Sequence, residues 1–215
     1  MDNGTCYIFG AGEKTSCTID LESKDLVIAA DGGYDYLVDL GLRADVVLGD
    51  FDSVTSPELW EDSICEKYTY PPEKDDTDMM LAIKLGLSRG YLDFAIYGGL
   101  GGRLDHTIAN IQALTYLAKE GAAGILYGEA YALTVISNGS FTIPKDATGT
   151  VSVFSLSDRS ENVTIKGLQY EIDGAVLTNS FPLGVSNETT GKKGVIHVTS
   201  GTLLILWHPG NEITE

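Results

Sequence analysis

Two aspartates, Asp50 and Asp52, stand two residues apart directly after the apolar run Val46–Leu48. The run predicts a buried strand, so both carboxylates fall where the strand gives way to a loop. Side chains alternate along an extended chain, which would point the two acids the same way. Like charges this close repel one another unless a cation or a shared proton relieves them. Mg²⁺ holding a polyphosphate would do so, although the pattern alone also suits a solvated turn.

A second polar stretch, from Lys74 to Asp78, opens a predicted helix. Asp75 or Asp76 could cap that helix, and acids in a first turn complement its dipole. Capping needs only one or two of these groups. Lys74 could hold a phosphate, Asp78 could face a metal, and the hydroxyl of Thr77 could serve either.

Asp31, Gly32 and Gly33 follow another apolar run. Paired glycines let the backbone bend sharply and let a ligand approach closely. The alternative is an ordinary turn in which Asp31 caps the next helix. This segment alone favours the turn.

Four glycines, Gly101 among them, lie between a strand ending at Tyr97 and a helix beginning at Leu104. Their amides could turn toward an anion at the helix N-terminus, and the guanidinium of Arg103 matches phosphate oxygens. Glycines cost stability, so their density predicts a ligand. We interpret His106 as a helix-start residue rather than a catalyst.

Strands must alternate with helices to position these junctions. Apolar runs predict strands at Cys6–Phe9, Leu26–Ala30, Asp45–Leu48, Phe94–Tyr97 and Ile125–Tyr127. Helical spacing predicts helices at Tyr34–Leu40, Asp78–Leu87 and Leu104–Lys119, the last with Ile108, Ile111, Leu114 and Ala118 on one face. This alternation predicts a mostly parallel, Rossmann-like sheet with flanking helices. The strand-to-helix junctions would then share one edge of the sheet, where ligands bind.

The pattern changes near Ala130, beyond which no helix is expected. Short β-rich runs follow at Leu133–Ile136, Ser140–Ile143, Val151–Leu156, Val163–Ile165, Val195–Val198 and Leu203–Trp207. Turn signals separate several of them, which predicts a small antiparallel sandwich or barrel. We therefore divide the chain into an α/β domain at 1–132 and a β domain at 133–215. We interpret the segment from Gly184 to Glu188 as a polar loop.

Bulk properties limit the function and its location. A formal net charge of −17 argues against nucleic acid and against an anionic membrane surface. The three scattered cysteines favour a reducing compartment. The N-terminus lacks the basic region of a signal peptide, and no apolar stretch is long enough to span a membrane. We expect a soluble, cytoplasmic protein.

The order of these motifs resembles the thiamine pyrophosphokinase family. The resemblance rests on Asp-Gly-Gly, Gly-Asp-Phe-Asp-Ser, Lys-Asp-x-Thr-Asp, Gly-Gly-Arg-x-Asp-His and a later Ser-Asn, over about residues 30–110 and 184–207. It implies transfer of a pyrophosphoryl group from ATP to the hydroxyl of thiamine, with release of AMP. It also implies a homodimer whose thiamine site is completed at the subunit interface.

Residue roles follow from the same resemblance. Mg²⁺ would bind Asp50, Asp52 and Asp78. The nucleotide and its phosphates would contact Asp31, Gly32, Lys74, Asp75, Thr77, Gly101 and Arg103. The thiamine side would include Asp105, Ser186 and Asn187, with Tyr170 or Trp207 as aromatic candidates, although Trp207 reads as a core residue. As catalytic residues we take Asp50, Asp52, Asp75, Asp78 and Arg103; Asp75 is the favoured proton acceptor, because a metal-bound acid is a poor base.

Two other hypotheses fit part of the pattern. A phosphohydrolase would use Asp50 as a covalent nucleophile, but it leaves the glycine loop and the β domain unexplained. A non-catalytic nucleotide or thiamine sensor would bind without turnover, and it would not need a complete set of acids.

Overall fold

The computed structural model describes residues 4–16, 18–50, 65–71 and 73–210. The chain divides into two compact units, Met1–Glu129 and Ala130–Glu215. No helix among the described residues is long and apolar enough to cross a membrane.

The first unit is built on a parallel sheet with the strand order β6-β5-β1-β2-β3-β4. Its strands are β1 (Thr5–Phe9), β2 (Leu26–Ala30), β3 (Val46–Gly49), β4 (Glu66–Thr69), β5 (Asp93–Tyr97) and β6 (Ala123–Tyr127). Its described helices are α1 (Gly33–Leu40), α3 (Asp78–Ser88) and α4 (Leu104–Lys119). The predicted parallel α/β architecture is confirmed.

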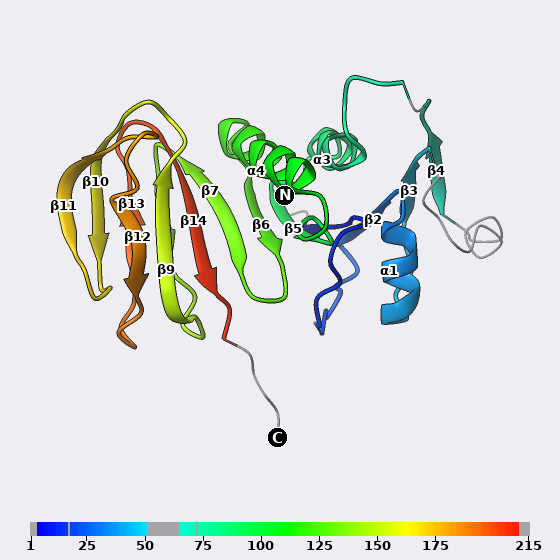
Figure 1. Ribbon diagram of the computed structural model, residues 1–215. Helices are drawn as coiled ribbons and strands as arrows, with labels where there is room; N and C mark the ends of the chain where they lie inside the picture. Colours follow the sequence, from blue (N-terminus) through cyan, green and yellow to red (C-terminus); the bar gives the residue numbers. More distant parts are fainter. Residues whose placement is uncertain (1–3, 17, 51–64, 72, 211–215) are drawn as a thin grey trace. The chain divides into compact units, whose positions relative to one another are not determined.

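Helices cover both faces of this sheet. Figure 1 shows α1 on one face and α3 and α4 on the other. Phe9, Val27, Val47 and Tyr97 pack with α1 in one buried cluster. Cys6 and Phe94 face α3, because a side chain added at Gly86 of that helix would meet both of them. Burial on both faces explains why these strands are continuous apolar runs.

The predicted face of α4 is partly wrong. Its bounds are as expected, but the buried residues are Ala113, Leu114 and Leu117, and Ile108 is 51% exposed. Only the later turns of the helix pack on the sheet, whereas Ala109 and Asn110 of the early turns line a cavity.

The second unit consists of two antiparallel arrangements. One has the order β12-β9-β14-β7 and the other β11-β10-β13-β8. The strands are β7 (Ala132–Ser137), β8 (Ser140–Thr142), β9 (Thr148–Ser155), β10 (Ser160–Lys166), β11 (Ile172–Leu177), β12 (Gly184–Glu188), β13 (Val195–His197) and β14 (Thr202–His208). Trp207 is 2% exposed, which confirms it as a core residue.

Candidate active site

Two glycine loops lie backbone to backbone at the carboxyl ends of β1 and β5. The Gly10 amide donates to the Tyr97 carbonyl at 2.8 Å, and the Gly12 amide donates to Gly98 at 2.8 Å. Gly98 has φ +64°, and a Cβ there would lie 2.2 Å from the Gly10 carbonyl oxygen. Close packing of two chain segments therefore accounts for glycines at these positions without a ligand.

Gly102 differs from its neighbours. Its φ is +62°, and a Cβ there would meet nothing within 4 Å. Within the described part of the chain, the amides of Gly101, Gly102 and Arg103 donate to no protein acceptor. These amides directly precede α4, so they form an anion-binding geometry at a helix N-terminus.

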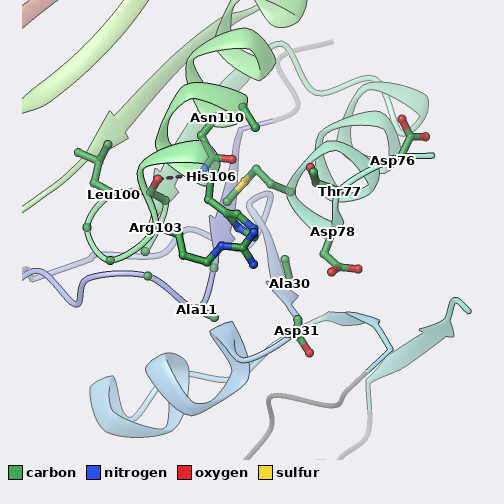
Figure 2. A pocket seen from close by; sticks show the side chains of 18 of the residues that line it. Ala11, Ala30, Asp31, Asp76, Thr77, Asp78, Leu100, Arg103, His106 and Asn110 are labelled. Atoms are coloured by element: carbon green, nitrogen blue, oxygen red, sulfur yellow. Dashed lines mark hydrogen bonds between the residues drawn. The ribbon is translucent and has the colours of Figure 1, made fainter. Parts of the chain in front are cut away.

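A cavity of about 550 Å³ lies beside these loops (Figure 2). It brings together seven sequence-predicted site residues, namely Asp31, Asp50, Lys74, Thr77, Asp78, Gly101 and Arg103. Gly32, Asp75 and Asp105 do not line it. Asp52 lies outside the described residues.

Asp31 is held at the cavity by an unusual backbone. Its φ is +50°, its amide donates to the Leu48 carbonyl at 2.8 Å, and a Cβ on Gly49 would lie 3.1 Å from its Cα. The interpretation of Asp31 as a helix cap is wrong, because Gly32 is the N-cap of α1 and makes no side-chain cap bond. A left-handed non-glycine residue beside a cavity is a conformation that clusters at functional sites.

Thr77 caps α3, which corrects the expectation for Asp75 or Asp76. The Met80 amide donates to Thr77 Oγ1 at 3.2 Å. Asp76 instead receives two hydrogen bonds from Lys84, at 2.6 and 2.8 Å, and Asp75 is exposed. The Thr77 hydroxyl therefore accepts a hydrogen bond from the helix backbone, and this cap fixes the start of α3 at the cavity wall.

Lys74 and Asp78 form an ion pair inside the cavity. Lys74 Nζ lies 2.8 Å from Asp78 Oδ1, and the two side chains are 14% and 26% exposed. The contact between the two atoms does not have hydrogen-bond geometry. Within the described residues, neither atom makes a hydrogen bond. Both atoms are thus buried and incompletely satisfied.

Arg103 is paired with Asp105 at the mouth of the cavity. Its Nη2 lies 2.6 Å from Asp105 Oδ2 and its Nε lies 3.2 Å from Oδ1. The hydrogen bonds from Arg103 lower the pKa of Asp105 to about 2. Asp105 is therefore ionised at every pH at which the protein would be assayed.

Replacement of Arg103 by Met should return the Asp105 pKa toward its ordinary value of 3.8. The depressed pKa means that any stabilisation from this pair is present above pH 3.8 and is lost as pH falls through about 2. A carboxyl ¹³C NMR titration of both proteins measures the shift. An equally low Asp105 pKa in the variant would show that another group holds the carboxylate.

Oxygen ligands for a divalent cation are present on the cavity wall. Asp50 and Asp78 both line it. The described residues, which leave out Asp52, contain no group of three or more histidine, cysteine or acidic side chains that could hold a metal. The buried Asp78 Oδ1 without a hydrogen bond, together with Asp50, suits an oxygen-seeking ion such as Mg²⁺.

Several lining residues were not predicted from the sequence. His106 and Asn110 lie on α4 with Arg103 before them, and Figure 2 shows both at the cavity. Asn110 Nδ2 donates to the Gly99 carbonyl at 2.7 Å and so fixes the glycine loop. The spacing of these residues along one helix face is the signal that could have identified them.

In the second unit, Ser186 and Asn187 lie on β12 rather than in a polar loop. A register shift between Gly184 and Asn187 marks a bulge, and Ser186 has φ +59°. Asn187 is 5% exposed. Its Oδ1 accepts from the Tyr170 amide at 2.9 Å and its Nδ2 donates to the Tyr170 carbonyl at 2.7 Å. Asn187 therefore holds the backbone of Tyr170, whose side chain is 63% exposed.

Comparison with known proteins gives matches over both units. Residues 20–126 match the family described as thiamin pyrophosphokinase, catalytic domain, and residues 140–203 match thiamin pyrophosphokinase, vitamin B1 binding domain. The chain is 29% identical over 188 residues to thiamine pyrophosphokinase of Bacillus subtilis (strain 168), covering 86% of this chain and 88% of the relative.

Solved structures give the same result. A crystal structure of thiamine pyrophosphokinase from Bacillus subtilis has a TM-score of 0.85 and 27% identity, over 96% of this chain and 99% of that chain. One from Geobacillus thermodenitrificans has a TM-score of 0.84 over 97% and 99%. Its identity of 22% supports the fold alone.

Proposed function

Because the chain belongs to the thiamin pyrophosphokinase family, we propose that it transfers a pyrophosphoryl group from ATP to thiamine. The thiamine hydroxyl oxygen would form a bond to the β-phosphorus as the bond from that phosphorus to the α–β bridging oxygen breaks. The products are thiamine diphosphate and AMP, and the hydroxyl proton is released. The observation that carries the proposal is one cavity lined by carboxylates, by the cationic side chains of Lys74 and Arg103, and by amides that donate to no acceptor among the described residues.

We assign phosphate binding to the backbone amides directly before α4 and to the side chains of Arg103 and Lys74. The amides of Gly101, Gly102 and Arg103 would donate to phosphate oxygens at the N-terminus of α4. The Arg103 guanidinium can bind two oxygens of one phosphate. Among the described residues Lys74 Nζ finds no hydrogen-bond acceptor, so its donors can serve a ligand. Fixed donors of this kind stabilise the charge on a transferring phosphoryl group.

A magnesium ion would be held by Asp50 and Asp78, with Asp52 as the third predicted ligand. When bound, such an ion offsets phosphate charge and polarises the phosphorus for attack. Asp75 is exposed and does not line the cavity, so we assign it no proton-accepting role.

We propose Asp105, Ser186 and Asn187 as candidate residues for binding thiamine. Asn187 is already bonded at both ends of its amide to Tyr170, so its role would be to position that residue. The exposed ring of Tyr170 is the better candidate for stacking on thiamine, because Trp207 is buried in the core.

The test is to incubate the purified protein with ATP, Mg²⁺ and thiamine, and to quantify AMP and thiamine diphosphate together. Equal formation of both products, lost when thiamine is omitted or EDTA is added, supports the proposal. Free phosphate with a phosphoenzyme at Asp50 would favour a phosphohydrolase. Saturable binding of ATP or thiamine with no turnover would favour a sensor.

We also propose that the chain forms a homodimer through its second unit. Five large apolar side chains in the segment 170–185 are exposed, namely Tyr170 (63%), Val176 (41%), Phe181 (65%), Leu183 (52%) and Val185 (41%). Exposed apolar side chains in this number are typical of an association surface.

The cytoplasm remains our proposed location, in keeping with the free thiols of Cys6 and Cys65.

A Phe181→Asp substitution should therefore shift the protein from dimer to monomer at micromolar concentration. A charge in the centre of an apolar interface loses its hydration without gaining a partner. Light scattering coupled to gel filtration measures the mass. Val38→Asp, at another exposed apolar residue (42%) in the first unit, is the matched control and should stay dimeric. Identical masses for the two variants would place the interface elsewhere.

A further inference from the structure

The Lys74–Asp78 pair is unusual because both partners are also the groups that would bind ligands. Lys74 Nζ is 2.8 Å from Asp78 Oδ1, four residues along the chain, at the start of α3. Both residues line the cavity. The proposed function assigns Asp78 to the cation and Lys74 to a phosphate, so each would have to leave the other.

The pair is poorly satisfied for its burial. An ammonium group has three donors, and a carboxylate oxygen can accept more than one bond. Within the described residues, neither Lys74 Nζ nor Asp78 Oδ1 makes a hydrogen bond. The Tyr70 ring also lies near the ammonium group, with its centroid 5.9 Å from Nζ. Breaking such a contact costs less than breaking a fully hydrogen-bonded pair.

The pairing of the neighbouring charged residues leaves Lys74 to neutralise Asp78. Asp31, Asp50 and Asp76 line the same cavity, but Asp76 already binds Lys84. Arg103 is bound to Asp105 at the mouth. Lys74 is thus the cation placed to neutralise Asp78 while no ligand is bound.

We propose that Lys74 acts as an internal counter-ion that occupies Asp78 in the ligand-free protein and transfers to a phosphate group when a divalent cation reaches Asp78. The inference rests on the proposed function of this cavity. It makes metal and nucleotide binding cooperative through the protein, since each ligand releases the group that the other needs. Lys74 is then a positioning residue for Asp78 as well as a phosphate ligand.

The first experiment measures Mn²⁺ binding without nucleotide, by calorimetry on the full chain. Lys74→Met removes the competing cation and should tighten Mn²⁺ binding about tenfold, within the usual range of coupling between sites. Lys74→Arg keeps a cation beside Asp78 and should bind Mn²⁺ as the wild type does. Lys166→Met removes an equal charge from the second unit, near Glu171 and Asp173, and should also match the wild type.

The second experiment measures ATP binding in EDTA, without metal. Asp78→Asn releases Lys74 and should tighten metal-free ATP binding about tenfold. Lys74→Met should weaken it. The double variant should lack the gain seen in Asp78→Asn, because a double-mutant cycle isolates the pairwise term. Thermal melts check that each variant is folded.

The inference is overturned if Lys74→Met binds Mn²⁺ no tighter than the wild type, or if Asp78→Asn binds ATP in EDTA no tighter. Both readouts are free of turnover and of thiamine. If both variants show these gains but the wild-type protein forms no thiamine diphosphate, the proposed function is contradicted and the exchange of partners at Lys74 and Asp78 is still supported.

Discussion

Asp50→Asn should reduce turnover on the order of 10³-fold while leaving the fold at least as stable as the wild type, as expected when a fixed group for transition-state charge is removed. The cavity places Asp50 with Asp31 and Asp78, so a neutral amide relieves repulsion among carboxylates. An amide is also a weaker ligand for Mg²⁺ than a carboxylate. The kcat for thiamine diphosphate formation and the melting temperature are measured on the same preparation.

Asp93→Asn is the matched control for this change. Asp93 is an exposed aspartate at the amino end of β5, the end opposite the glycine loop. The substitution removes the same charge from the same sheet, and turnover should be unchanged. Wild-type turnover in Asp50→Asn, or equal losses in both variants, would defeat the assignment of Asp50 to the metal.

Gly98→Ala should lower the free energy of unfolding by roughly 3 kcal/mol or more, among the larger effects of single substitutions. The new methyl group would lie 2.2 Å from the Gly10 carbonyl oxygen, and the position has φ +64°. Backbone atoms on both sides must shift to accommodate it. The change is measured as a drop in melting temperature, at about 2–4 °C per kcal/mol for a chain of this size.

The Gly102→Ala variant separates the steric clash expected at Gly98 from the backbone strain of a positive φ. Its φ of +62° is nearly the same, but no atom outside its own chain neighbours lies within 4 Å of the added carbon. The cost should be about 1 kcal/mol, that of a left-handed alanine alone. Equal melting temperatures for the two variants would show that the loops around Gly10 and Gly98 are free to separate.

Most of the first unit could be predicted from local pattern. Apolar runs buried on both faces identify β1, β2, β3 and β5, and the helix Leu104–Lys119 has the predicted bounds. Strand β4 was missed because Glu66–Thr69 is exposed along its whole length and carries no apolar run. Strand β12 was missed because its bulge breaks the period-two alternation.

The site was predicted from topology more than from any one motif. Carboxyl ends of parallel strands share an edge, which correctly gathered Asp31, Asp50 and Arg103 around one cavity. The sequence could not show that Asp75 would face solvent while Asp78 faces inward, since that depends on where α3 begins. Nor could it show that Gly98 is required by the chain segment at Gly10, because that contact is long-range.

The pairing of the two glycine loops also constrains when the site can form during synthesis. The loop at Gly10–Gly12 emerges early, yet its amides donate to the carbonyls of Tyr97, the last residue of β5, and of Gly98. A nascent chain that ends before β5 has Asp31 and Asp50, which follow β2 and β3, but it lacks the loop that carries the proposed phosphate-binding amides. Chains are made from the N-terminus, and distant pairings wait for the intervening segment. The cavity therefore cannot be completed until β5 and the loop that follows it have been made.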